Sequence, residues 1–308
     1  MLAGVTVGLV VPASAVSAQP SVSELTQQIN KESEELVKVV ESYNRLNEEA
    51  KATRAAAEEI DTKLGPLQEE LARAEVEVGQ IAITAYKTGG LSTASALLDG
   101  ASDNFLHRLG TLDHLARDRQ QRLSSFTSTQ LTYLAEQEKL QAALAKQDAQ
   151  VKELADRKEK IEAEIDELMA KRERAYGAAN QAGSSYTGTV PSISGAAGTA
   201  VSFAYGAIGS PYVWGSSGPN GYDCSGLTLA AWRAAGKSLP HNAAMQWDRV
   251  VKINRSALAP GDLVFYNGLA HVALYVGNGQ VIHAPTFGRP VELASVDMMA
   301  PYGFGRVP

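Results

Sequence analysis

Two long stretches of this chain repeat apolar residues at alternating steps of three and four, a spacing typical of coiled-coil helices. The first runs from Val22 to Ala85, and only Glu32 and Thr53 interrupt it with polar side chains. Gly65-Pro66 lies inside it and predicts a kink or a local break. About sixty residues at 1.5 Å each predict a helix of roughly 90 Å. The other seam residues are Leu25, Ile29, Leu36, Val39, Tyr43, Leu46, Ala50, Ala57, Ile60, Leu64, Leu67, Leu71, Ala74, Val78 and Ile81.

The second stretch keeps the same spacing from Leu140 to Leu168, with Gln147 and Lys158 as its polar interruptions. Two such seams in one chain predict an antiparallel coiled-coil hairpin, an all-α region over residues 19–176. The same seams also fit a dimer. The apolar positions in between are Leu144, Val151, Leu154, Ile161 and Ile165.

The segment between the two stretches is expected to form the tip of the hairpin. Gly89-Gly90 and Gly100 break the periodicity there, and short apolar helices are expected at Ser95–Leu98 and Phe105–Leu115. The Leu and Phe side chains of this tip either pack on one another to close the hairpin or form a docking surface.

Charge and aromatic content divide the 308-residue chain into two unlike parts. Up to residue 194 it has 21 basic and 29 acidic residues, a formal charge of −8, and beyond it 7 and 5, a charge of +2. Thirteen of the 20 aromatic residues, including all three Trp, lie in the second part, which alone has the bulky side chains of a globular core. Residues 177–196 are rich in Gly, Ser, Ala and Thr and predict a flexible linker before a domain at 197–308.

The first 18 residues contain only apolar, small and hydroxyl side chains and end in Val16-Ser17-Ala18. We interpret residues 1–18 as a signal-like segment cleaved after Ala18, although no Lys or Arg precedes its apolar run. No later apolar run reaches that length, so the mature chain is expected outside the cytoplasmic membrane, secreted or periplasmic.

The sequence beyond residue 197 predicts an α+β domain. One helix is expected near 198–208, before a break at Pro211, and another from Cys224 to Gly236. Strands are expected near 262–266, 271–276 and 280–284.

Cys224 is the only cysteine, which excludes an intramolecular disulfide and a four-cysteine zinc site. It opens the second predicted helix of the domain, where free N–H groups and the helix dipole favour a thiolate. The position fits a nucleophile, and equally a small buried hydrophobic residue.

Two histidines, His271 and His283, lie on the two arms of a predicted β-hairpin whose connection contains Gly277-Asn278-Gly279. A three-residue loop places both on one face, with Cα atoms about 7–8 Å apart. A two-residue Asn278-Gly279 turn places them on opposite faces, so a shared site requires the odd-length loop. On one face they complete a nucleophile, base and orienting residue with Cys224. A Cys/His/His zinc site is the competing use of the three residues.

Five motifs, in this order, resemble those of the NlpC-type cell-wall peptidases, a papain-superfamily group that hydrolyses peptide bonds in bacterial peptidoglycan stems. The resemblance covers residues from about 198 to 308 and implies a papain-like α+β fold that needs no cofactor or metal. The motifs are Tyr212-Val213-Trp214-Gly215, Asp223-Cys224-Ser225-Gly226-Leu227, Pro260-Gly261-Asp262-Leu263-Val264-Phe265, His271-Val272-Ala273-Leu274-Tyr275-Val276-Gly277 and Ile282-His283-Ala284.

The resemblance implies that Cys224 is the nucleophile, His271 the base, and His283 the residue that fixes the tautomer of His271. Tyr212 would donate its hydroxyl to the oxyanion, beside the backbone N–H of Cys224. Packing alone is the other interpretation of Tyr212.

The resemblance also implies that Asp223, Ser225, Trp214 and His241 line the substrate groove. An anionic Asp223 attracts a cationic amine of the stem peptide, or is a plain helix N-cap. His241 stands where many relatives have Arg, and fits either a substrate contact or a surface residue.

The family most often cleaves after D-γ-glutamyl and before meso-diaminopimelate, and this bond is expected here. The coiled coil resembles that of actinobacterial cell-division hydrolases of the Rip type, which stay inactive until the FtsEX membrane complex engages the coiled coil. Autoinhibition is therefore expected, and a chain starting near Gly195 should digest peptidoglycan faster than the full chain. The alternatives are a coiled-coil scaffold or activator whose C-terminal domain binds wall peptides without cleaving them, and an acyl or peptidyl transferase.

Overall fold

The computed structural model describes residues 21–88, 105–177 and 183–308. They divide into two units, one with residues up to Asn44 and from Glu159 onward, the other with Arg45–Lys158. The signal-like segment 1–18 and the expected helix Ser95–Leu98 lie outside the described residues.

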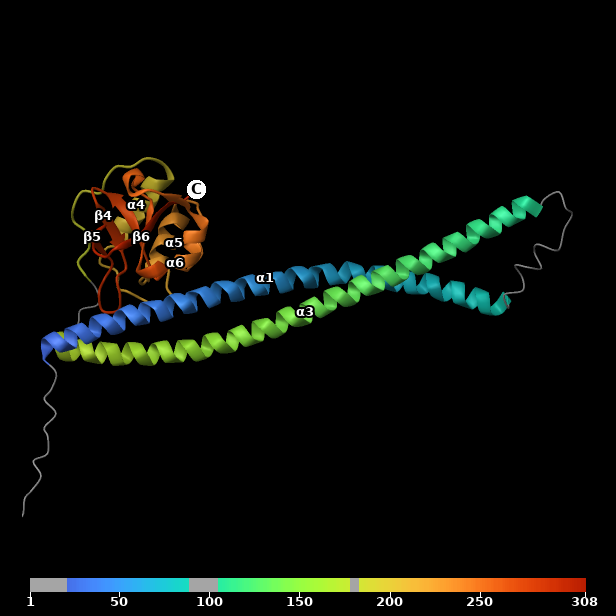
Figure 1. Cartoon of the computed structure of the whole chain (residues 1–308), viewed down its shortest axis with the longest axis horizontal. Helices are drawn as coiled ribbons and strands as arrows, with labels where there is room; N and C mark the ends of the chain where they lie inside the picture. The colour runs from blue at the N-terminus through green and yellow to red at the C-terminus, as the bar shows by residue number, and fades with distance from the viewer. Residues whose placement is uncertain (1–20, 89–104, 178–182) are drawn as a thin grey trace, which may run out of the picture. The chain divides into compact units, whose positions relative to one another are not determined.

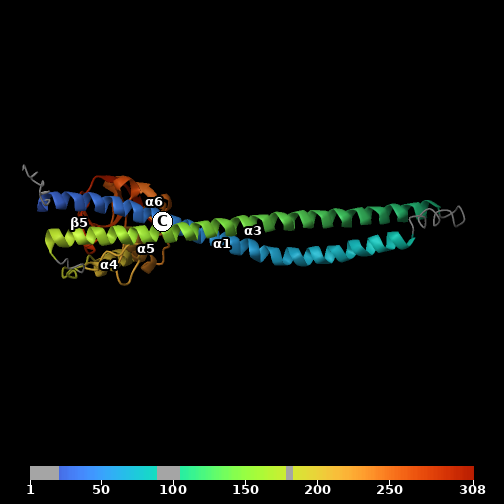
Figure 2. The same cartoon turned by 90° about the horizontal axis from the view of Figure 1, so that it is seen from below.

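The two heptad stretches form two long helices, α1 (Val22–Thr88) and α3 (Phe105–Tyr176), which run antiparallel and side by side (Figures 1 and 2). In the second unit, Arg122 pairs with Glu77 at 3.2 Å. In the first, Lys171 reaches Glu32 at 2.6 Å and Tyr176 reaches Thr26 at 2.7 Å. These cross-helix pairs confirm the antiparallel hairpin.

Two details of the hairpin differ from the sequence prediction. The expected short helix at Phe105–Leu115 is the first part of α3, because nothing after it breaks the helix. Pro66 lies inside α1 without ending it, since a proline removes only one hydrogen bond and the flanking turns keep theirs. None of the described helices has the length and apolar content needed to cross a membrane.

The C-terminal domain is a six-stranded antiparallel sheet with three helices, which confirms the α+β prediction (Figure 1). The strand order is β1-β6-β2-β3-β4-β5, and every neighbouring pair is antiparallel. The helices are α4 (Gly195–Ala207), α5 (Cys224–Ala234) and α6 (Ala243–Arg249). The strands are β1 (Val251–Ile253), β2 (Leu263–Tyr266), β3 (His271–Gly277), β4 (Gln280–His283), β5 (Glu292–Ser295) and β6 (Pro301–Arg306). Two 3-10 turns lie at Arg255–Ala257 and Asn267–Leu269.

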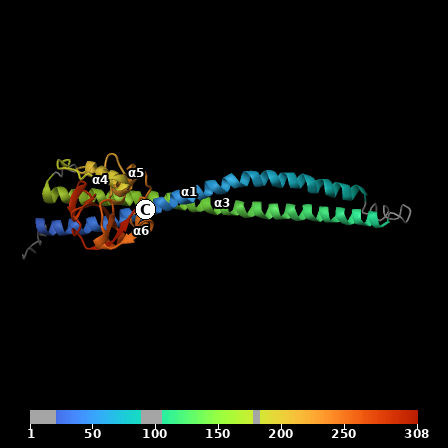
Figure 3. The ribbon, with the colours of Figure 1, turned by 90° about the horizontal axis from the view of Figure 1, so that it is seen from above.

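The core of the domain lies between the sheet and the pair α4 and α5, which are neighbours in Figures 1 and 3. Leu227 of α5 packs there with Leu274 of β3 and Ile282 of β4, all three fully buried. Alternation along β3 sends Ala273 to a smaller cluster on the other face of the sheet. The first turn of α5 is therefore held rigidly against β3.

The described part of the predicted linker lies against this domain. The Gly183 N–H donates to the Gly209 carbonyl at 3.0 Å, and the Tyr186 ring packs on Tyr205 with centroids 4.8 Å apart. The packed domain therefore extends back to Gly183.

The β3–β4 hairpin combines a two-residue turn with a bulge, an arrangement the sequence analysis did not consider. Asn278 and Gly279 form the turn with φ of 53° and 71°, and Gly277 pairs with Gln280. The register then shifts by one residue, so that Leu274 pairs with Ile282. The bulge thus restores the register of the odd-length loop, and the two histidines share a face despite the short turn.

Candidate active site

The predicted nucleophile stands at the first position of α5, as the sequence indicates. Asp223 caps this helix, accepting from the Gly226 N–H at 2.7 Å. The N-cap interpretation of Asp223 therefore describes a real contact. The same carboxylate lies 2.9 Å from Nε2 of His241, which is buried rather than on the surface. Cys224 is 1% exposed. Its thiol lies near the start of β3, where a hydrogen bond from the Val272 backbone favours the thiolate.

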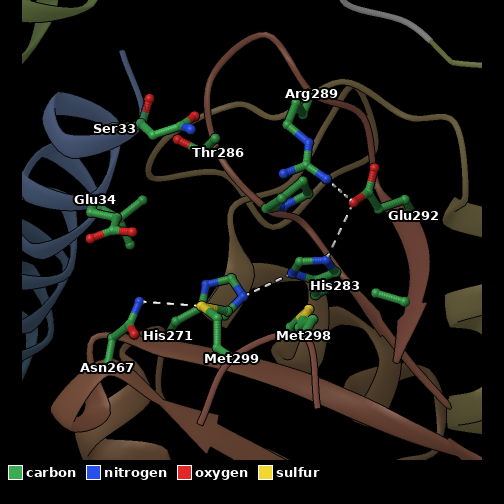
Figure 4. Close-up of a pocket in the computed structure, with 14 residues that line it drawn as sticks. Ser33, Glu34, Asn267, His271, His283, Thr286, Arg289, Glu292, Met298 and Met299 are labelled. Atoms are coloured by element: carbon green, nitrogen blue, oxygen red, sulfur yellow. Dashed lines mark hydrogen bonds and ion pairs between the residues drawn. The ribbon is translucent and has the colours of Figure 1, made fainter. Parts of the chain in front are cut away.

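The two histidines form a hydrogen-bonded pair. Nε2 of His271, the first residue of β3, lies 2.9 Å from Nδ1 of His283, the last residue of β4, and their ring planes are 85° apart. Both histidines are at least 97% buried. Figure 4 shows them at one wall of a cavity of about 410 Å³, with Glu292 beyond His283.

Tyr212 is buried, and its hydroxyl has no hydrogen-bond partner among the described residues. Its ring packs on Phe287 with centroids 4.7 Å apart. Burial raises the pKa of Tyr212 well above its usual value, and Cys224 is the next contributor, which marks the hydroxyl as a neighbour of the thiol. A buried hydroxyl without a partner is free to donate to a ligand.

A residue that sequence reasoning missed, Glu41 of α1, reaches the predicted nucleophile. Its Oε1 accepts from the Ser225 hydroxyl at 2.6 Å and from the Cys224 thiol at 3.6 Å. Its Oε2 accepts from the Asn242 amide at 2.8 Å and from the Ala243 N–H at 2.6 Å. One carboxylate of the hairpin thus fills the space next to the thiol.

Other residues on the same face of α1 extend this contact. Asn44, one turn beyond Glu41, donates to Oδ2 of Asp223 at 3.0 Å. The ring of Tyr43 meets Trp214 edge-on with centroids 5.2 Å apart. Three of the four residues predicted to line a substrate groove, Asp223, Ser225 and Trp214, therefore contact α1. The fourth, His241, is bound to Asp223.

The closed arrangement keeps both reactive groups uncharged. Burial, with Glu41 and Asp223 adding to it, raises the pKa of the Cys224 thiol well above its usual value. Burial lowers the pKa of His271 well below its usual value, and His283 adds to the effect. The expectation of a thiolate at the helix start is therefore wrong for this conformation, because two nearby carboxylates and the loss of water outweigh the helix dipole.

Burial and the neighbouring Asp223 raise the pKa of Glu41 to about 7, against the opposing hydrogen bonds from Ser225 and Ala243.

Within the described ranges, no three His, Cys, Asp or Glu side chains are grouped so as to hold a metal ion. His271 and His283, two of the three residues of the alternative zinc site, are hydrogen-bonded to each other.

The family model described as the NlpC/P60 family matches residues 209–302. A probable endopeptidase of Corynebacterium glutamicum is 46% identical over 93 residues, which are 30% of this chain and 44% of that protein. The NlpC/p60 domain of the peptidoglycan hydrolase SagA is 37% identical, covering 36% of this chain and 97% of that one, with a TM-score of 0.34. The chain belongs to the NlpC/P60 family.

The family likeness is confined to the C-terminal domain. The probable endopeptidase p60 of Listeria grayi is 43% identical over 105 residues, which are 32% of this chain and 20% of that protein. This NlpC/P60 chain thus spans less than half the length of these curated relatives. Glu41 lies outside the matched region, which explains why no family motif could indicate it.

The single thiol provides a direct test of the closed site. Cys224 should react with iodoacetamide at least about tenfold more slowly than a free cysteine at pH 8, and its reaction should rise only at a higher pH, because the thiol is buried and its pKa is raised. The measurement is a rate of alkylation by mass spectrometry. The chain in guanidinium serves as the control and should react fully; a free-cysteine rate in the native chain would contradict the closed geometry.

Proposed function

We propose that this protein is a cysteine endopeptidase that hydrolyses peptide bonds in peptidoglycan stems. The observation that carries the proposal is the thiol of Cys224 at the start of α5, a helix that packs on β3, together with the hydrogen-bonded pair of His271 at the start of β3 and His283 at the end of β4. Membership of the NlpC/P60 family, with relatives named probable endopeptidases, supports the same reaction.

The proposed mechanism uses the nitrogen of His271 that does not face His283. Nδ1 takes the proton of the Cys224 thiol, and the thiolate attacks the scissile carbonyl carbon. The unpartnered hydroxyl of Tyr212 and the backbone N–H of Cys224 donate to the oxyanion. His271 then returns the proton to the leaving amine, and water hydrolyses the thioester to release the acid and the thiol.

The proposed bond is the one between D-γ-glutamyl and meso-diaminopimelate, which the family resemblance implies. Asp223, Ser225, Trp214 and His241 are the proposed groove residues. The buried carboxylate of Asp223 supports recognition of a cationic amine, and its contact with His241 holds it in place.

We further propose that the hairpin holds the enzyme inactive. Glu41 and Asn44 bond to residues flanking and including the nucleophile, and Tyr43 covers Trp214. A stem peptide needs the same space, so α1 and substrate would compete for it. We place the protein outside the cytoplasmic membrane at the cell wall, in division or daughter-cell separation, with an FtsEX-type complex engaging the coiled-coil tip to release the domain. The resemblance of the coiled coil to those of cell-division hydrolases supports this last step.

The first test measures release of stem-peptide fragments from peptidoglycan by the full chain carrying Glu41→Ala, whose site is expected to be open, with and without Cys224→Ala. The Cys224→Ala variant should lose at least about 1,000-fold in rate, since removal of a nucleophile leaves only binding and oxyanion stabilisation. Equal fragment release would support the inactive scaffold instead. A condensed product formed with an added amine acceptor would indicate a transferase.

The second test opens the site by removing one carboxyl. Glu41→Ala in the full chain should raise the hydrolysis rate several-fold, because it removes the hydrogen bonds to Ser225, Asn242 and Ala243 while leaving the domain intact. The matched control is Glu35→Ala on the same helix, whose side chain is 62% exposed and pairs with Lys38.

The control should hydrolyse at the wild-type rate. A chain starting at Gly183, which keeps the packing of Tyr186 on Tyr205, sets the upper limit of the fully open enzyme. If Glu41→Ala and the shortened chain were both no faster than the wild type, autoinhibition by α1 would be wrong.

The third test follows from the pKa of Glu41, which is raised to about 7 in the closed site from an ordinary 4.5. Closing the site therefore makes Glu41 take up a proton. The closed state is most stable at a pH below 4.5, the ordinary pKa of Glu41, and its stability falls as the pH rises through about 7. The rate of the full chain relative to the chain starting at Gly183 should rise on the order of tenfold between pH 5.5 and 8.5. The same ratio for Glu41→Gln, which cannot titrate, should stay nearly flat. The ratio cancels the titrations of Cys224 and His271 in the open site, which both chains share.

A further inference from the structure

The polar chain that starts at His271 does not end at His283. In Figure 4 the ring of His283 lies between His271 and Glu292 of β5, a residue that no sequence motif indicated. Nε2 of His283 is 3.6 Å from Oε1 of Glu292. Glu292 lies directly opposite His283 in the β4–β5 register, so the contact is built into the sheet rather than carried by a loop.

Glu292 is held as an anion. Burial raises the pKa of its carboxyl, but the contacts with His283 and Arg289 outweigh burial and lower it below its usual value. Arg289 forms a hydrogen-bonded ion pair with the same oxygen, Oε1. A fixed carboxylate therefore faces the outer nitrogen of the second histidine.

The proton positions follow from counting donors and acceptors. A carboxylate only accepts, so the favourable partner at His283 Nε2 is an N–H, while a lone pair there would face a negative charge. At 3.6 Å this is a charge contact rather than a short hydrogen bond, and Nε2 has no hydrogen-bond partner among the described residues. A neutral imidazole carries one N–H, so His283 Nδ1 has the lone pair and must accept from Nε2–H of His271.

We propose that Glu292 is a positioning residue that sets the tautomers of both histidines and leaves the lone pair of His271 on Nδ1. The inference rests on the proposed peptidase function, in which that lone pair receives the proton of Cys224. During the transfer the S–H bond breaks and an Nδ1–H bond forms, while the two Nε2–H protons stay where they are. The positive charge on His271 then faces the carboxylate of Glu292 through the ring of His283.

The first experiment reads the tautomers directly in the resting full chain. Long-range ¹H–¹⁵N spectra of protein labelled at histidine resolve five rings, and both His271 and His283 should carry the proton on Nε2. In Glu292→Leu, the ring of His283 should shift measurably toward the Nδ1–H form. Glu292→Gln, which keeps a carbonyl acceptor, should retain most of the wild-type pattern. The matched control Glu34→Leu removes another carboxylate lining the same cavity and should leave both rings unchanged.

The second experiment measures hydrolysis of a soluble stem peptide in the full chain carrying Glu41→Ala. Adding Glu292→Leu should lower kcat about 10- to 100-fold, the range seen when a carboxylate that orients a metal-bound histidine is lost, with KM changed less than about threefold. Glu292→Gln should recover most of kcat. A purely structural role would instead lower both variants alike and leave the tautomers untouched.

An Nδ1–H proton on His283 in the wild type overturns the inference, and that measurement needs no variant to fold. An unchanged kcat in a folded Glu292→Leu chain overturns it too. A chain without Cys224-dependent hydrolysis refutes the proposed function instead, and it leaves the tautomer assignment to be judged by the spectra alone.

Discussion

The carboxylate of Glu41 is a charge taken out of water, and the closed form of the site depends on how that charge is compensated. Burying an unpaired carboxylate costs several kcal/mol, far more than the apolar contacts of one helical turn return. Donors from Ser225, Asn242 and the Ala243 backbone offset that cost, while Asp223 opposes it. The result is a carboxyl with a pKa of about 7, poised between its two forms at neutral pH. The proposed closure by α1 therefore depends on a carboxyl whose burial is only partly compensated.

The placement of His271 and His283 on one face of the sheet depends on a one-residue shift in the pairing of β3 with β4. An Asn-Gly turn of two residues is the most favoured hairpin connection, yet alone it would turn His271 and His283 to opposite faces. The bulge between Tyr275 and Gly277 supplies the missing residue. It makes the hydrogen bond between the two rings possible. The pairing of β4 with β5, which has no bulge, places Glu292 opposite His283.

Local signals in the sequence were sufficient for the helices and for much of the candidate site. Heptad spacing predicted α1 and α3, and the Asp-Cys pair predicted a capped helix start. Glu41 could not be found in this way, because a glutamate in a coiled-coil helix is usually solvated and its partners follow nearly two hundred residues later. Glu292 could not be predicted for a related reason. Its contact with His283 comes from the pairing of β4 with β5, and no motif includes it. The bulge was missed because two turn lengths were weighed and a combination of turn and bulge was not.

Covering the site changes its chemistry as well as its access. An active thiol–imidazole pair must separate charge, with a thiolate facing an imidazolium, and both ions need water or donors around them. In the closed form the pKa of Cys224 is raised and that of His271 is lowered, so the proton stays on sulfur. Both shifts have burial as their first cause, and for Cys224 the carboxylate of Glu41 comes second. Withdrawal of α1 would therefore restore water and remove a negative charge at once.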